Sequence, residues 1–155
     1  MDLDDDEINT ACCSLLSHLC HHPDGKLITL EADALGALAV MLESDCAAVR
    51  QRATGAIAGL TVEFKAKMRT MELAGPALVR LVNDEDAIVS SNALIAIENA
   101  CEIPEARAAM KKLLHGDEES LLKDFVIWPK PHTNYRRHIR PFPEEGADEY
   151  ASTST

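Results

Sequence analysis

The sequence ALGALAVMLESDCAAVRQRATGAIAGLT, residues 34–61, returns forty residues later as AGPALVRLVNDEDAIVSSNALIAIENAC, residues 74–101. Identical residues at equivalent positions are Ala34 and Ala74, Ala37 and Ala77, Leu38 and Leu78, Ala47 and Ala87, Val49 and Val89, Ala53 and Ala93, Ala56 and Ala96, and Ile57 and Ile97. A fixed period of this length is typical of repeat proteins, whose units stack only on their neighbours. Because such a stack builds a surface and no enclosed cavity, the repeat predicts a binding module.

The apolar spacing within the repeat predicts helices. In residues 47–60 apolar side chains recur at i, i+4, i+7, i+8 and i+11, and the same spacing occurs in residues 87–101 and 8–19. These are three equivalent long helices. Shorter helices are predicted between and after them, at residues 25–32, 35–42, 63–73, 76–82, 105–114 and 120–126. The polar turns ESDC and NDED precede the second and third long helices and offer capping side chains.

The composition favours an all-α fold. Aromatic residues make up only 4% of the chain, whereas alanine supplies 22 of its 155 residues, and small side chains let helices approach closely. No apolar run reaches the roughly 20 residues of a membrane span, and the start MDLDDDE is not a signal peptide. We expect a cytoplasmic protein without membrane contact, with an acidic leader at 1–7, helical repeats at 8–126 and an extended tail at 127–155.

Five cysteines and no secretory signal predict free thiols in a reducing compartment. Cys12, Cys13 and Cys20 lie close in sequence to three histidines, so a metal or thiol site in residues 12–22 is one alternative reading. The spacing matches no known zinc pattern, however, and the repeat register places Cys12 with Ala53 and Cys20 with Thr61. We therefore predict buried structural cysteines, no metal site and no cofactor.

The charge distribution directs attention to the tail. The net charge of −11 argues against nucleic-acid binding, which depends on neutralising phosphates, yet residues 129–143 carry four basic residues and no acid. Four prolines in the same stretch favour extended backbone. Aromatic and aliphatic side chains lie between the basic ones, so this stretch is predicted to contact a protein, with an unfolded tail as the alternative. The predicted contact residues are Trp128, Lys130, Tyr135, Arg136, Arg137, Ile139, Arg140 and Phe142.

The order of features resembles the armadillo repeat across residues 5–115. A Gly or Pro opens the second helix (Gly36, Pro76), leucines follow inside it, a polar turn comes next, and a Val starts the third helix (Val49, Val89). HEAT repeats have two helices per unit, and the additional short helices favour armadillo. The resemblance implies a short right-handed helical solenoid.

Armadillo domains of the importin and catenin kind bind extended peptides in a groove lined by the third helices. The resemblance places their gripping asparagines at positions 18, 59 and 99, where this chain has His18, Gly59 and Asn99. Only Asn99 matches. A peptide carrier that uses Asn99, with Glu98 and Arg50 nearby, is therefore an alternative function, and a helix-end role for Asn99 is the alternative for the residue.

A narrower resemblance concerns the closing repeat. NDEDAIVSSNALIAIENACEIPEARAAM, residues 83–110, is similar to the last repeat of the ciliary radial spoke armadillo proteins, which have a comparable xPExR step, here residues 103–107. This resemblance implies the axoneme of a motile cilium, where small armadillo proteins dock on larger complexes.

Only residues 26–60 and 63–101 form complete three-helix units, whereas a stable solenoid generally needs about three repeats. The first long helix would then leave an apolar face open to another protein or a second copy. The alternative is that the tail, residues 127–142, folds back and caps the stack. We expect a non-enzymatic structural adaptor that docks on a larger assembly through its helices and tail. The sequence contains no phosphate loop, nucleophile elbow or HExxH motif.

Overall fold

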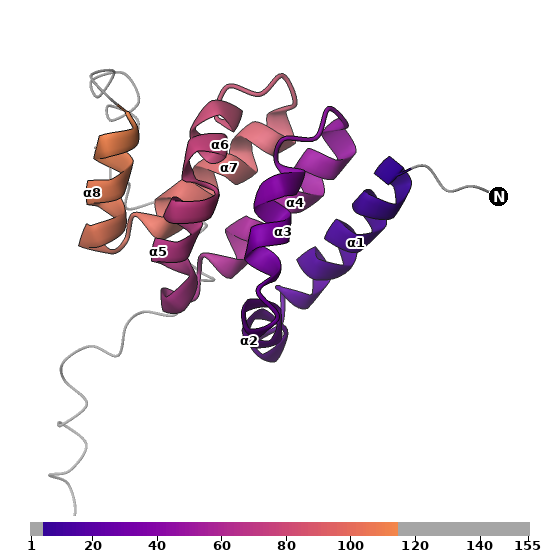
Figure 1. Cartoon of the computed structure of the whole chain (residues 1–155), viewed down its shortest axis with the longest axis horizontal. Helices are drawn as coiled ribbons and strands as arrows, with labels where there is room; N and C mark the ends of the chain where they lie inside the picture. The colour runs from indigo at the N-terminus through magenta and orange to yellow at the C-terminus, as the bar shows by residue number, and fades with distance from the viewer. Residues whose placement is uncertain (1–4, 115–155) are drawn as a thin grey trace, which may run out of the picture. The chain divides into compact units, whose positions relative to one another are not determined.

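The computed structural model describes residues 5–114, and every regular element within them is an α-helix (Figure 1). The helices in this range are α1 (Asp5–Leu19), α2 (Pro23–Glu31), α3 (Ala34–Met41), α4 (Ala47–Leu60), α5 (Phe64–Leu73), α6 (Gly75–Leu81), α7 (Ala87–Ala100) and α8 (Pro104–Leu113). The predicted all-α class is confirmed for this part of the chain.

The three long helices α1, α4 and α7 have 15, 14 and 14 residues and pack in sequence order. The middle one, α4, packs against both α1 and α7. Figure 1 shows α3 in front of α4 and α6 in front of α7, and both pairs are in contact. Two pairs of shorter helices thus separate three long ones, as the spacing predicts.

The short helices between the long ones, α2, α3, α5 and α6, begin and end within two residues of the boundaries predicted from the sequence. At α2 the helix begins at Pro23, because proline is well tolerated in the first turn of a helix. The fragment predicted at residues 120–126 and the tail predicted at residues 127–155 lie outside the described residues.

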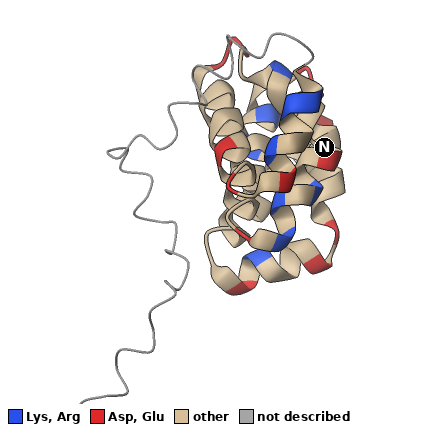
Figure 2. Cartoon of the chain, turned by 90° about the vertical axis from the view of Figure 1, so that its left-hand side faces the viewer, with Lys and Arg blue, Asp and Glu red and all other residues tan. Residues whose placement is uncertain are grey.

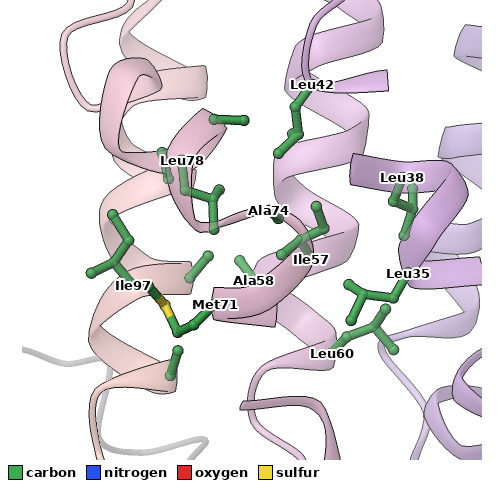
Figure 3. Packing of buried hydrophobic residues seen from close by; sticks show 14 of the residues in the cluster. Leu35, Leu38, Leu42, Ile57, Ala58, Leu60, Met71, Ala74, Leu78 and Ile97 are labelled. Carbon is green, nitrogen blue, oxygen red and sulfur yellow. The ribbon is translucent and has the colours of Figure 1, made fainter. Parts of the chain in front are cut away.

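The core lies between the long helices and the short helices that cover them. Figure 3 shows Leu35 of α3 near Leu60 of α4, and Met71 of α5 near Ile97 of α7. The side chains at the centre of α4 and α7 are small: Ala53 and Ala93 are both 0% exposed. Alanine at these positions lets the covering helices approach closely, which explains the alanine-rich composition.

The turns before α4 and α7 provide the predicted caps, but unequally. The Asp86 carboxylate accepts hydrogen bonds from the backbone N–H groups of Ile88 (2.9 Å) and Val89 (3.0 Å), which caps α7. At the start of α4, Cys46 makes no side-chain cap, although its own N–H donates to Ser44 Oγ (3.1 Å). Within residues 5–114 no helix is both long and apolar enough to cross a membrane.

Candidate protein-docking site

Helix α1 carries a row of exposed apolar side chains. Ile8 is 43% exposed, Leu15 is 62% exposed and Leu19 is 37% exposed. Together with the exposed thiol of Cys12 they follow the spacing i, i+4, i+7 and i+11, which aligns them along one face of a helix. A large exposed side chain is common singly, but an aligned row of them is not.

The equivalent positions of α4 and α7 are completely buried. These counterparts, which lie 41 residues on in α4 and 81 residues on in α7, are all 0% exposed: Val49, Ala53, Ala56 and Leu60 in α4, and Val89, Ala93, Ala96 and Ala100 in α7. The helix ends agree with this register, since α1, α4 and α7 end at the equivalent residues Leu19, Leu60 and Ala100. The same helix face is therefore buried in α4 and α7 but exposed in α1.

The prediction that Cys12 is a core residue is wrong, because Cys12 is exposed. Its counterpart Ala53 is 0% exposed in α4, which α2 and α3 contact, whereas the described residues contain no such helices ahead of α1. Cys13 is the buried neighbour, at 2% exposed, and lies in the main core. The prediction for Cys20 is confirmed, since it is 3% exposed at the end of α1.

Exposed apolar residues continue from α1 onto α2 and α3. Leu27 and Ile28 of α2 are 44% and 61% exposed, and Val40 of α3 is 66% exposed. The three helices adjoin in chain order, since α1 contacts α2 and α2 contacts α3. We define the N-terminal apolar face as the large exposed apolar residues of these three helices: Ile8, Leu15, Leu19, Leu27, Ile28 and Val40. It holds six of the nine large exposed hydrophobic residues in the described part of the chain.

The counterparts of Ile28 and Val40 contact the helices before them. Arg69, the counterpart of Ile28, pairs with Asp33 at 2.7 Å, and Arg80, the counterpart of Val40, pairs with Glu43. These contacts join α5 and α6 to the ends of α3. Leu27, Ile28 and Val40 were not predicted from the sequence. The repeat did contain a signal, because Ile28 and Val40 are apolar at the positions where the following short helices carry the charged residues Arg69 and Arg80.

Asn99 does not line an open groove in this structure. It is 8% exposed, and its side-chain Nδ2 donates to the backbone carbonyl of Ala58 in α4 (3.1 Å). Arg50, predicted to lie near it in a peptide groove, instead donates to the Asp84 carboxylate from Nε (2.9 Å) and from Nη2 (3.2 Å). One N–H donor of the Asn99 amide is thus engaged in a contact between α7 and α4.

Lys67 of α5 was not predicted from the sequence either, and it is 2% exposed. Its Nζ donates to the carbonyls of Thr61 (3.0 Å) and Asn99 (2.7 Å) and to Glu102 Oε2 (2.7 Å). These carbonyls lie at the C-terminal ends of α4 and α7, where helix dipoles favour a positive charge. Lys67 therefore fastens two long helices together.

The cysteine and histidine cluster of residues 12–22 is dispersed over different faces. Cys13 and Cys20 are buried, and burial raises the pKa of both thiols. His18 and His21 are exposed, and each ring nitrogen Nδ1 lies 2.7 Å from a carbonyl one turn earlier in the helix. In the part of the chain that the structure describes, no three His, Cys, Asp or Glu side chains are grouped to hold a metal ion.

The predicted tail contacts lie outside the described residues, so they stay sequence predictions: Trp128, Lys130, Tyr135, Arg136, Arg137, Ile139, Arg140 and Phe142. Among the described helices, basic and acidic residues both occur across the view in Figure 2. The apolar face is thus the most distinctive surface of residues 5–114.

Comparison with the models of known protein families and with curated proteins finds no match to this sequence.

Proposed function

We propose that this chain is a non-enzymatic adaptor with an armadillo-like helical solenoid, which docks on a larger protein assembly through the N-terminal apolar face. One observation carries the proposal: the apolar row of α1 is exposed, whereas its counterparts in α4 and α7 are 0% exposed. Residues of this type at these positions otherwise serve as core. A surface built like a core is suited to permanent contact with protein.

The solenoid architecture is supported by recurrence at the forty-residue period. Each of α4 and α7 is preceded by two short helices, has alanine at the centre of its buried face and follows a polar turn. Contacts within residues 5–114 run mainly between neighbours in this series. Such quasi-linear stacking is what repeat proteins share.

The energy available from the face is considerable. Burying a fully exposed leucine or isoleucine contributes about 1.5–3 kcal/mol. About half of that contribution is available at each of Ile8, Leu15 and Ile28, which are 43%, 62% and 61% exposed. A partner that covered several such residues would offset the entropy that association costs. The tail adds a second contact in this proposal, through its basic and aromatic residues.

The decisive experiment is disruption of the face in the full chain. A Leu15→Asp, Ile28→Asp variant is expected to lose at least about tenfold in co-purification with its assembly from native cells, because each carboxylate would be desolvated in the interface. Ile88 of α7 is 56% exposed and lies outside the face, so Ile88→Asp is the matched control and should retain incorporation. Retained incorporation of the double variant, with normal circular dichroism, would contradict the proposal.

The tail is tested separately, by deletion of residues 128–155. The shortened chain is expected to keep the helical signal of residues 5–114 but to incorporate less efficiently. The narrower proposal, an assembly in the axoneme of motile cilia, rests on the resemblance of the closing repeat, residues 83–110, with its xPExR step at residues 103–107. A fluorescently tagged chain in ciliated cells should then label the axoneme, and diffuse cytoplasmic signal would count against this location.

A further inference from the structure

The chain contains a template for what covers the N-terminal apolar face. Leu35, Leu38 and Leu42, from α3 and its C-terminal end, are each 1% exposed, and α3 packs across α4 (Figure 3). In the same way α6 packs across α7, with Leu78 at 0% exposed. Both covered helices present the apolar spacing that α1 presents to solvent. A short helix, a turn and a leucine-bearing helix therefore fit the open face.

Resting on the adaptor function proposed above, we propose that the N-terminal apolar face binds a helix pair of the α2–α3 type from a partner protein. The leucine-bearing helix of the pair lies across α1 as α3 lies across α4. In this geometry Cys12 is covered by the pair, because its counterparts Ala53 and Ala93 are 0% exposed in α4 and α7, the helices that α3 and α6 pack against. The pair extends the packing series by one member, since α1 already packs on α4 as α4 packs on α7.

The ends of the partner's pair have a defined chemistry. Within this chain, Asp33 and Glu43 flank α3 and accept Arg69 and Arg80 from the following helices. On the N-terminal apolar face the counterparts of these arginines are Ile28 and Val40. A carboxylate placed against them would lose water without gaining a partner. The partner's pair therefore has uncharged residues where α3 is flanked by Asp33 and Glu43.

Grafting tests this inference on the full chain. A copy of residues 22–45 replaces residues 1–4 directly ahead of Asp5, which preserves the register because Asp5 is the counterpart of Cys46. Within the copy alone, Asp33→Asn and Glu43→Leu remove the two acids. We expect the grafted pair to raise the midpoint of thermal unfolding by at least about 5 °C. Site-resolved alkylation should show Cys12 modified at least about tenfold more slowly.

Two matched grafts locate the cause of any gain. A copy that also carries Leu35→Asp and Leu38→Asp should give no rise in midpoint and no protection of Cys12, because its covering face is no longer apolar. A copy that retains Glu43 should give a smaller rise than the copy with Glu43→Leu, because its carboxylate meets Val40. An equal rise with and without Glu43 would overturn the predicted chemistry of the partner.

Two results would overturn the docking geometry itself. One is a graft that leaves both the midpoint and Cys12 alkylation unchanged. The other is a native chain that dimerises in sedimentation analysis and protects Cys12 as concentration rises, which would identify a second copy as the occupant. Because the graft is measured on purified protein, it is independent of the adaptor function. If the graft stabilises the chain but the Leu15→Asp, Ile28→Asp variant is fully incorporated, the adaptor function is contradicted and the docking geometry is not.

Discussion

Among single residues, Lys67 makes the most concentrated set of interactions. Its buried ammonium satisfies the carbonyls of Thr61 and Asn99 and pairs with Glu102. A buried charge is costly unless it is paired and hydrogen-bonded, and here one side chain meets three acceptors. The cost of removing it falls on those acceptors, which would remain buried without a donor.

We expect Lys67→Met to lower the free energy of unfolding by about 2–4 kcal/mol, because it leaves a carboxylate and two helix-end carbonyls without their donor. The neighbouring Lys65 is exposed, so Lys65→Met should change the free energy of unfolding by no more than about 0.5 kcal/mol. Urea unfolding followed by circular dichroism measures both. Equal values for the two variants would show that the Lys67 contacts contribute nothing specific.

Asp84 gives the fold a dependence on pH. The hydrogen bond from Arg50 lowers the pKa of the Asp84 carboxyl below its ordinary value. The stability from this pair is therefore present above a pH of about 4 and is lost as pH falls through the lowered pKa. Asp84→Asn should reduce stability by about 1–2 kcal/mol at pH 7, and by less than half of that amount at pH 3.

Measurement of the unfolding free energy of both chains at the two pH values checks the Asp84 prediction. All other carboxylates titrate in both chains, so their effects cancel in the difference. A difference between the chains that stays constant down to pH 3 would mean that the charge of Asp84 is unimportant.

At the scale of elements, the junction between α1 and α2 depends on a glycine. A Cβ atom at Gly25 would lie 2.1 Å from the backbone oxygen of Leu19, which no side-chain movement can relieve because backbone is involved. A Cβ atom at Gly36 in α3 would meet no neighbouring atom within 4 Å outside its own stretch of helix. The close approach of Leu19 therefore requires glycine at position 25, whereas position 36 has room for a side chain.

Gly25→Ala should destabilise the fold by at least about 1–3 kcal/mol, because α2 must shift away from the end of α1. Gly36→Ala should stabilise it by up to about 1 kcal/mol, since alanine is the better helix former. Thermal and urea unfolding of the two variants provide the comparison. If Gly25→Ala leaves the stability unchanged, the junction between α1 and α2 can move apart at no cost, contrary to the close contact of its backbone atoms.

For the molecule as a whole, protection is expected to fall toward the open end. Within residues 5–114, α4 has long helices on both sides and α3 across it, whereas α1 has α4 and α2. Local opening is easier where fewer apolar contacts are lost. Hydrogen exchange followed by mass spectrometry should show α1 amides exchanging at least about tenfold faster than those of α4. Equal protection would place α1 in one cooperative unit with α4.

Much of the fold was predictable because it depends on local spacing. The apolar period placed helices at α4 and α7 to within a residue, and Pro76 and the NDED turn marked helix starts. The site was harder to predict. Periodicity identified the apolar row of α1 correctly, but it cannot distinguish a core face from an open one, so Cys12 was predicted to be buried. Likewise Asn99 matched a motif, while its bond to Ala58 depends on how closely α7 approaches α4.

The sequence by itself determined the helices of residues 5–114, their order and which face of each long helix is apolar, because these follow from backbone propensity and side-chain spacing. Only the tertiary structure decided which apolar faces are covered. Burial depends on neighbours: Ala53 is 0% exposed in α4, which α3 packs against, whereas its counterpart Cys12 in α1 is exposed. The tertiary arrangement likewise brings Lys67 to its acceptors and leaves Leu27, Ile28 and Val40 exposed.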